Sequence, residues 1–262
     1  MEPLGYAKRM DGGRTGRAAH GTSAAVAAAW HDPKQRRLVV ALAAAALSAI
    51  AFAHIAEDYV TNDPLVRWDV SFARWLAGER STVGIDFFRV VTFLGSPAVA
   101  LAVGAVVCVV LYRRGRLVEA ALLPLVLGGA ELLNLILKLS FHRPRPDVAF
   151  VNIDTYSFPS GHAMISTAAY GALAYLAWGR LRTPRARLAL VFGTVAFVAL
   201  VGFSRLYLGV HYLSDVLAGF AGGVFWLAVS IALLTVYGDR FAARFAGSRA
   251  DRLGQRVVRR RR

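Results

Sequence analysis

Long runs of apolar residues, separated by short polar connections, dominate this chain. A helix needs roughly 20 consecutive apolar residues to cross a bilayer. Six segments meet or approach that length, and the fourth and fifth are short, so their polar flanks must lie close to the membrane surface. The predicted spans are 38–56, 90–112, 117–139, 162–178, 188–203 and 213–237. The pattern therefore predicts an all-α polytopic membrane protein with six transmembrane helices.

Composition supports this prediction and narrows the function classes. Of 262 residues, 56% are hydrophobic and only 18% are charged, with the charges clustered between the apolar runs. The single cysteine, Cys108, excludes an intrachain disulfide framework and a Cys-rich metal site. The net charge of +15 would suit nucleic acid binding in a soluble protein. In a membrane protein it is explained by basic cytoplasmic loops, so we expect no nucleic-acid partner.

Lysine and arginine also indicate the orientation, because they concentrate in cytoplasmic connections. With six spans, the N-terminal tail, the second and fourth connections and the C-terminal tail share one side, and all four are basic. We therefore predict a basic cytoplasmic tail over 1–37, a membrane domain over 38–237 and a second basic cytoplasmic tail over 238–262. A multi-pass protein of the cell membrane, of the bacterial inner-membrane type, is expected. The oligomeric state is not indicated.

Two features near the first span leave alternatives open. The tripeptide at 51–53, Ala-Phe-Ala, resembles a signal-peptide cleavage site, although the 37 residues before the first span are many for a signal peptide. The first connection carries apolar residues at helical spacing, which predicts a short helix at the outer interface. Those residues are Leu65, Trp68, Phe72, Trp75 and Leu76.

Ionisable residues gather where the predicted spans reach the outer side, against the positive-inside bias. Charged groups in a span are costly, so a cluster of them indicates a functional site. Long side chains reaching toward the interface would explain a single Lys or Arg, but not two histidines and an aspartate. The candidate site residues are Lys138, Arg145, Ser160, Gly161, His162, Arg205, His211 and Asp215.

These residue types suit a tetrahedral dianion. One ammonium and two guanidiniums can bind its oxygens. Pro159-Ser160-Gly161 is typical of a helix start, where serine can cap and free backbone amides attract an anion. His211 and Asp215 are four residues apart, so on a helix they would share a face, and the carboxylate would orient the imidazole. His162 has no carboxylate in its own motif and is free to act as an acid.

A metal site is the alternative use of two histidines and an aspartate. Three nearby cations would repel a metal ion, so we predict no metal and no cofactor.

The three elements resemble the signature of the type 2 phosphatidic acid phosphatase (PAP2) superfamily, membrane lipid phosphatases that share a site with vanadium haloperoxidases. That signature is K-x6-R-P, then P-S-G-H, then S-R-x5-H-x3-D. Every fixed position is present here in order: Lys138 to Pro146, Pro159 to His162, and Ser204 to Asp215. The resemblance covers about 65–237 and leaves both tails without an assigned function.

The resemblance implies a metal-independent hydrolysis in two steps. His211 would attack phosphorus to form a phosphohistidine, with Asp215 orienting it as catalytic partner. His162 would protonate the leaving group and later help to activate water. Phosphate binding would fall to Lys138, Arg145, Ser160, Gly161 and Arg205.

Two rival functions remain open: a phosphotransferase that passes the phosphoryl group to an alcohol, and a non-catalytic phospholipid-binding membrane protein. The expected partners are the membrane and a lipid phosphate substrate, at a site on the extracytoplasmic side. A polyprenyl pyrophosphate is favoured by a small margin over phosphatidic acid and phosphatidylglycerol phosphate.

Overall fold

A computed structural model describes the backbone of residues 32–61, 64–151 and 153–259, and the side chains of these residues except 65 and 246–259. Over these residues the chain forms eight helices and no strand, which confirms the all-α prediction. The helices are α2 (Pro33–Thr61), α3 (Pro64–Gly78), α4 (Thr82–Leu94), α5 (Pro97–Arg113), α6 (Leu117–Phe141), α7 (Gly161–Trp178), α8 (Pro184–Tyr207) and α9 (Leu213–Arg259).

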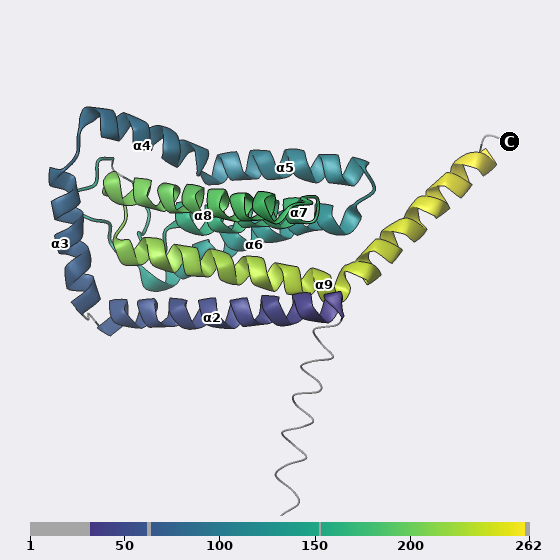
Figure 1. Cartoon of the computed structure of the whole chain (residues 1–262), viewed down its shortest axis with the longest axis horizontal. Coiled ribbons are helices and arrows are strands. Elements are labelled where there is room, and N and C mark those ends of the chain that lie inside the picture. The colour runs from purple at the N-terminus through teal and green to yellow at the C-terminus, as the bar shows by residue number, and fades with distance from the viewer. Residues whose placement is uncertain (1–31, 62–63, 152, 260–262) are drawn as a thin grey trace, which may run out of the picture.

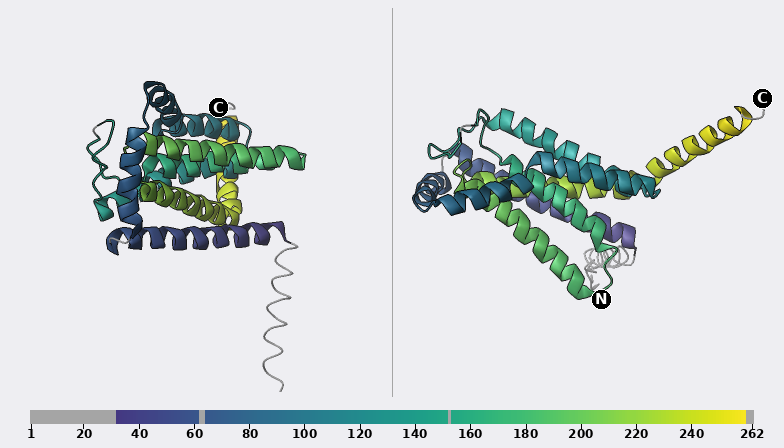
Figure 2. Two further views of the ribbon diagram at one scale, coloured as in Figure 1. Left: turned by 60° about the vertical axis from the view of Figure 1, so that its left-hand side comes forward. Right: turned by 90° about the horizontal axis from the view of Figure 1, so that it is seen from above.

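The helices other than α3 run lengthwise in the view of Figure 1, and α3 crosses one end of them; seen from above, α8 diverges from α5 and α6 (Figure 2). Helix α2 packs along α9 on one flank, while α4 and α5 follow one another on the opposite flank. Helix α7 is central and packs against α5, α6, α8 and α9. The largest apolar core lies where α5, α6, α7 and α9 meet.

Within the part of the chain that the structure describes, five helical segments are long and apolar enough to cross a membrane: Pro33–Thr61, Thr82–Arg113, Leu117–Phe141, Pro184–Tyr207 and Leu213–Phe245. They correspond to five of the six predicted spans. The remaining predicted span is α7, which forms as a helix but is not among these five segments. Because protein surrounds α7, its serine, threonine and glycine residues need not face lipid.

The second predicted span, 90–112, is in fact two helices that begin eight residues earlier. The break falls at Gly95, where α4 ends, and at Ser96, whose hydroxyl accepts a hydrogen bond from Val99 N at 3.3 Å. Pro97 then occupies the first turn of α5, where its missing N–H costs nothing. Gly95 also packs on Val201 of α8 so closely that a Cβ atom would lie 2.3 Å from Val201 Cγ1. Apolarity alone does not reveal this break.

Small residues allow α7 and α9 to approach closely, as the glycine-rich and alanine-rich spans predict. A Cβ atom on Gly223 of α9 would lie 2.5 Å from the carbonyl oxygen of Met164 in α7. A Cβ atom on Gly171 of α7 would lie 2.6 Å from Leu227 Cδ2 in α9. This packing places the start of α7 against the first turns of α9.

The short helix predicted in the first connection is present as α3, and it also has an inward face that the apolar pattern did not predict. Leu76 is buried and Phe72 packs inward, whereas Trp68 and Trp75 are more than half exposed. The inward stripe instead includes Asp69, which is fully buried. Leu65 lies outside the described side chains. The pattern of apolar residues missed Asp69 because an acid in an outer loop normally faces water.

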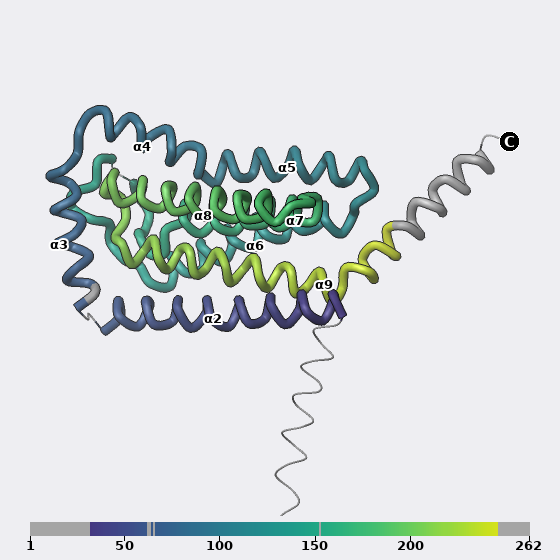
Figure 3. Tube along the Cα trace, in the orientation of Figure 1, coloured from purple at the N-terminus to yellow at the C-terminus, as the bar shows by residue number. Residues whose placement is uncertain are grey.

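The predicted tails are only partly described. Residues 1–31 and 260–262 lie outside the described residues, and residues 33–37 already belong to α2 (Figure 3). Helix α9 continues past 237 to Arg259, so the predicted boundary there is not a break in the helix. The tripeptide at 51–53 lies inside α2.

Candidate active site

The structure brings the predicted site residues together at the end of the bundle that α3 crosses. They come from four places: the end of α6, the loop that leads into α7, the end of α8 and the connection into α9. The residues are Lys138, Arg145, Ser160, Gly161, His162, Arg205, His211 and Asp215. Segments 77 positions apart in the chain thus meet around one imidazole.

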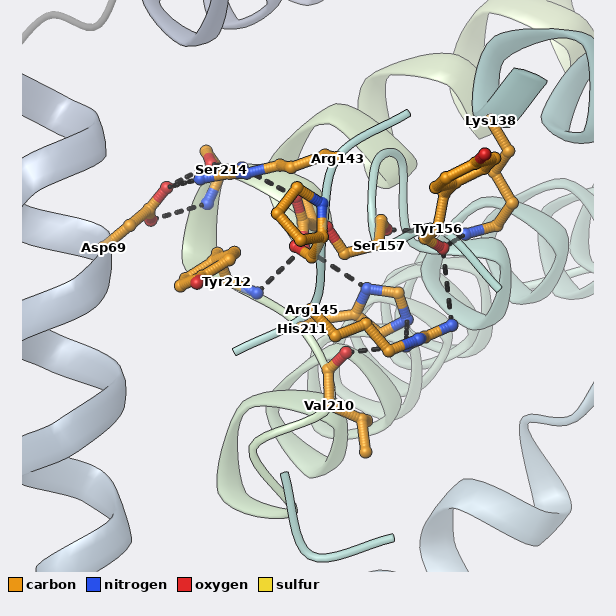
Figure 4. A network of polar contacts seen from close by, with 12 residues as sticks. Asp69, Lys138, Arg143, Arg145, Tyr156, Ser157, Val210, His211, Tyr212 and Ser214 are labelled. Atoms are coloured by element: carbon orange, nitrogen blue, oxygen red, sulfur yellow. Dashed lines mark hydrogen bonds and ion pairs between the residues drawn. The ribbon is translucent and has the colours of Figure 1, made fainter. Parts of the chain in front are cut away.

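His211 lies between a carboxylate and a guanidinium (Figure 4). Its Nδ1 atom is 3.4 Å from Asp215 Oδ2, and its Nε2 atom is 3.3 Å from Arg145 Nη1. A guanidinium only donates hydrogen bonds, so Nε2 must be the acceptor and the proton belongs on Nδ1. The imidazole therefore directs an unprotonated nitrogen toward the cations, which is the arrangement of a nucleophile with an orienting carboxylate.

The geometry differs from the predicted shared helix face. His211 precedes α9, which begins at Leu213, so His211 and Asp215 are not on one regular helix. The Asp215 carboxylate instead turns back and accepts a hydrogen bond from Tyr212 N at 2.9 Å. The spacing of four residues correctly predicted that Asp215 lies beside His211. The contact, however, is made at the start of a helix and not along one helix face.

Burial and nearby positive charges disfavour the protonated form of His211. Burial and the positive charges of Arg205, Arg145 and Lys138 hold the pKa of His211 well below its ordinary value. Burial also lowers the pKa of Arg145, and the nearby Asp215 carboxylate opposes this effect. Because a neutral imidazole can attack phosphorus and an imidazolium cannot, this environment favours a nucleophilic role.

Two buried polar atoms at the site lack a hydrogen-bond partner among the described residues, Ser160 Oγ and Arg205 Nε. Such atoms are rare, because an unpaired buried polar atom costs about 1–3 kcal/mol. Both belong to residues predicted to bind phosphate. Ser160 occupies the cap position of α7 but makes no side-chain cap bond, which leaves its hydroxyl free for a ligand and corrects the predicted capping role.

The cationic side chains are held by hydrogen bonds to backbone carbonyls and to a threonine hydroxyl of neighbouring segments. Arg145 donates to Thr155 O at 2.8 Å and to Val210 O at 2.6 Å. Lys138 donates to the carbonyl oxygen of Tyr156. Arg205 donates to Thr92 Oγ1 at 2.6 Å through a nitrogen other than its unpaired Nε. The three cations are therefore positioned before any anion binds.

His162 and Gly161 begin α7 at the same site. The side chain of His162 is partly exposed and makes no hydrogen bond to a described residue. A Cβ atom on Gly161 would lie 3.0 Å from Asn134 Nδ2, so a larger residue would displace this amide. The first turn of α7 also has backbone amides without helical partners, which suits an anion.

Sequence reasoning missed two charged residues beside the site. Arg143 lies inside the first motif at a position that the signature does not fix, and only 2% of it is exposed. Asp69 of α3 is fully buried and forms an ion pair with Arg143 at 2.9 Å. Arg143 also pairs with Asp215 at 2.7 Å. Its place between the fixed positions Lys138 and Arg145 was the only available signal.

The described residues contain no group of three or more His, Cys, Asp or Glu side chains arranged to share a metal ion. His211 instead shares its surroundings with three cationic side chains. Metal independence stays a prediction.

Comparison with known proteins identifies the family of the chain. The profile of the PAP2 superfamily matches residues 119–238. Phosphatidylglycerophosphatase B from Bacillus subtilis (strain 168) is 35% identical over 136 residues, which are 51% of this chain and 67% of that protein. Sphingosine-1-phosphate phosphatase 1 from Rattus norvegicus is 41% identical over 68 residues, 25% of this chain and 15% of that protein.

The fold has a solved counterpart as well. The crystal structure of a transmembrane PAP2 type phosphatidylglycerolphosphate phosphatase from Bacillus subtilis matches with a TM-score of 0.64 and 27% sequence identity. The match covers 75% of this chain and 96% of that one. With its helices, motifs and relatives in agreement, the chain belongs to the PAP2 superfamily and is a membrane phosphatase that hydrolyses phosphoric esters.

Proposed function

We propose that this protein removes phosphate from a lipid phosphate monoester through a phosphohistidine formed on His211. The observation that carries the proposal is the position of His211, with Nδ1 directed at Asp215 and Nε2 directed at Arg145. This arrangement supports attack by Nε2 and stabilisation by Asp215 of the positive charge that the ring gains.

In the first step, Nε2 of His211 forms a bond to phosphorus while the bond from phosphorus to the lipid oxygen breaks. His162 gives its proton to that oxygen, so the lipid leaves as an alcohol. Arg145, Arg205 and the free hydroxyl of Ser160 bind the phosphoryl oxygens as charge shifts among them. Asp215 stabilises the charged ring of His211.

In the second step, His162 accepts a proton from water, and the water oxygen bonds to phosphorus. The bond from phosphorus to Nε2 breaks, inorganic phosphate leaves, and both histidines return to their initial states. The two steps replace one difficult displacement by two easier ones. Their sum is hydrolysis of one phosphoric ester by one water molecule.

The activities named for the relatives guide the choice of substrate. Phosphatidylglycerophosphatase and sphingosine-1-phosphate phosphatase both name lipid phosphate monoesters. The sequence favoured a polyprenyl pyrophosphate by a small margin, on the compact size and the outward site alone. The relatives lead us to place phosphatidylglycerol phosphate first, with phosphatidic acid and the polyprenyl pyrophosphate as the alternatives.

Orientation is part of the proposal. The positive-inside rule places both termini in the cytoplasm and the active site on the extracytoplasmic side. The site residues lie at the bundle end opposite the start of α2, which supports a site remote from the cytoplasmic surface. The protein would then act on lipid phosphates in the outer half of a bacterial inner membrane.

A phosphate-release panel tests the proposal. Purified protein in detergent would be given phosphatidylglycerol phosphate, phosphatidic acid and undecaprenyl pyrophosphate at equal surface concentration, with His211→Ala as the control. We expect fastest release from phosphatidylglycerol phosphate and none from His211→Ala. Preference for the pyrophosphate would overturn the substrate choice, and phosphate appearing on an added alcohol instead of in solution would establish a transferase.

A further inference from the structure

Arg143 bridges two carboxylates that come from distant parts of the chain (Figure 4). Its Nη1 atom donates to Asp215 Oδ1 and to Ser214 Oγ, each at 2.7 Å. Its Nη2 atom donates to Asp69 Oδ2 at 2.9 Å. The fork of one guanidinium thus joins α3 to the start of α9, where the partner of His211 lies.

This ionic cluster is sealed from solvent. Asp69 and Asp215 are fully buried, and Arg143 is 2% exposed. The rings of Tyr59 and Tyr212 lie 4.7 and 4.3 Å from the centre of the guanidinium. Burial alone would lower the pKa of Arg143, but the two carboxylates outweigh burial and raise it. Removing a single member would leave an uncompensated buried charge.

Ser214 closes the cluster on the side of α9. Its backbone N–H donates to Asp69 Oδ1 at 3.0 Å, and its hydroxyl donates to Asp69 Oδ2. Asp69 therefore contacts both the guanidinium of Arg143 and the first turn of α9. A shift of α3 would move both of them, and the Asp215 carboxylate with them.

The two oxygens of Asp215 have separate partners. Oδ1 accepts from Arg143, while Oδ2 faces His211 Nδ1 and accepts from Tyr212 N. Arg143 consequently determines how the carboxylate is rotated toward the imidazole. The positive charge of Arg143 also stabilises the ionised form of Asp215. Asp69 weakens this effect, because its negative charge interacts with the same guanidinium.

We propose that Asp69 and Arg143 are positioning residues for the hydrolysis, holding the Asp215 carboxylate ionised and directed at His211, so that α3 is part of the active site. The proposal rests on the proposed role of His211 as nucleophile. Neither residue contacts the phosphoryl group in this scheme. Both act through Asp215.

A purely structural connection between α3 and the loop after α6 is the competing explanation, and the chain offers a matched control for it. Arg74 of α3 forms an ion pair with Asp147 of that loop at 3.1 Å. This pair joins the same two segments, but both side chains are more than 60% exposed and neither touches Asp215. Arg74→Gln therefore removes a connection without touching the buried cluster.

The experiment measures the pre-steady-state burst of nitrophenol from nitrophenyl phosphate against pH, for folded protein in detergent. The acid limb of this profile, where the burst rate falls as the pH decreases, reports the protonation of the His211–Asp215 pair as a unit. The other charged or titratable groups that face the pair, from four other segments, are Lys138, Arg145, His162 and Arg205. The variants are Arg143→Gln, Asp69→Asn, their combination and Arg74→Gln.

We expect Arg143→Gln to slow the burst by about 10–100-fold, the loss typical at metal sites when a residue that orients an active-site group from outside is removed. It should move the acid limb to higher pH, because the pair loses a nearby cation. Asp69→Asn should move the limb to lower pH, because Arg143 then acts on Asp215 without competition. The double variant should lose no more than about threefold beyond Arg143→Gln, since the two residues act as one unit. Arg74→Gln should match the wild type.

The proposal would be overturned if the acid limb of both single variants lay at the same pH as in the wild type. It would also be overturned if the rate reduction of the double variant equalled the product of the two single reductions. If Arg143→Gln does not fold, Asp69→Asn and Arg143→Lys decide, because lysine keeps the charge but lacks the fork and should be slow. A normal burst in folded Arg143→Lys would also overturn it. His211→Ala distinguishes failure of the proposed function from failure of this inference. A burst in His211→Ala would refute the nucleophilic role of His211. If His211→Ala gives no burst while the Arg143 and Asp69 variants behave like the wild type, only the positioning role is refuted.

Discussion

Gly219 of α9 faces the carbonyl oxygen of Ser160 so closely that a Cβ atom on Gly219 would lie 2.6 Å from it. One turn earlier on α9, the carbonyl of Asp215 accepts a hydrogen bond from Ser160 N at 2.9 Å. The same stretch of α9 therefore positions the partner of His211 and the serine predicted to bind phosphate. A glycine at 219 allows the two halves of the site to meet.

Gly219→Ala should damage activity by separating those halves. The added methyl group would also lie 2.9 Å from Ala163 Cβ, so α7 must shift. We expect a loss of about 1–3 kcal/mol in the free energy of unfolding, as is typical of overpacking, and a larger relative loss in kcat than in folded fraction. Denaturation in mixed micelles and phosphate release measure the two effects.

Gly193→Ala is the control for this substitution. Gly193 lies inside α8, and a Cβ atom there would have no heavy atom within 4 Å. Alanine is the better helix former by up to about 1 kcal/mol, so this variant should be at least as stable as the wild type and fully active. Equal activity of the two variants would show that the contact between Gly219 and Ser160 does not matter for catalysis.

Much of this architecture could be predicted from the sequence because the membrane restricts the choices. Apolar runs predicted the spans, and the meeting of Lys138, Ser160 and His211 followed from placing three motifs at the outer ends of helices. The break at Ser96 escaped because its two halves are both apolar. The buried face of α3 escaped because the cation that neutralises Asp69 is 74 positions away in the chain.

The detailed geometry of the site depends on such distant contacts. The sequence indicated that Asp215 partners His211, but not that Arg143 occupies the other oxygen of that carboxylate. A motif gives the spacing of residues that follow one another along the chain. It does not give the partners that folding brings to them from α3.

Orientation is tested by reporters. Fusion after Tyr237 should report the cytoplasm, and fusion between 147 and 156 should report the outer side, because the basic connections are expected to stay inside. Paired phosphatase and fluorescent fusions would measure this. Both reporters on one side would mean that α7 does not cross the membrane, and the reverse pattern would place the active site inside.

Chelation and vanadate separate phosphohistidine chemistry from metal chemistry. We expect EDTA to leave the phosphate-release rate unchanged, because cations already occupy the positions around His211. Vanadate should inhibit competitively, since it adopts the five-coordinate geometry of phosphoryl transfer beside Nε2. Inhibition by EDTA that Zn²⁺ or Mg²⁺ reverses would refute the mechanism.

The lowered pKa of His211 predicts a specific pH dependence. Burial, Arg205 and Arg145 lower the pKa of the His211 imidazole. The burst rate should therefore persist at pH values where a free histidine is protonated. Arg145→Gln removes one of these cations and should move the acid limb of the burst upward. The substrate phosphate titrates identically in both enzymes, so the difference between the two profiles reports the protein. Coinciding acid limbs would contradict this assignment.

The same shift makes stability depend on pH in a defined direction. Because the pKa of His211 is lower in the folded state, the unfolded chain takes up a proton first as the pH falls. The free energy of unfolding should therefore decrease as the pH drops below the ordinary value for histidine. His211→Gln removes this dependence. Its free energy of unfolding, relative to that of the wild type, should therefore increase as the pH falls. Thermal unfolding at several pH values would measure it.

The two histidines should fail in different ways. His211 has Asp215 at Nδ1, so we expect His211→Ala to lose the covalent route for every substrate. His162 has no such partner and is proposed to protonate the leaving oxygen, help that is typically worth about 10²–10⁴-fold. Nitrophenyl phosphate has a stable leaving group and needs little of that help in the first step. His162→Ala should therefore still be phosphorylated by it, yet turn over slowly because water activation is impaired.

Rapid mixing and acid quenching measure this difference. His162→Ala should give a burst of nitrophenol and accumulate a phosphoenzyme that is labile in acid and stable in base, as expected of a phosphorus–nitrogen bond. His211→Ala should give neither signal. Its thermal unfolding transition should still show that the variant is folded. With a lipid phosphate, whose alkoxide must be protonated as it leaves, His162→Ala should lose the first step as well. If the phosphoenzyme instead accumulates in His211→Ala, the two roles are reversed, and His162 is the nucleophile.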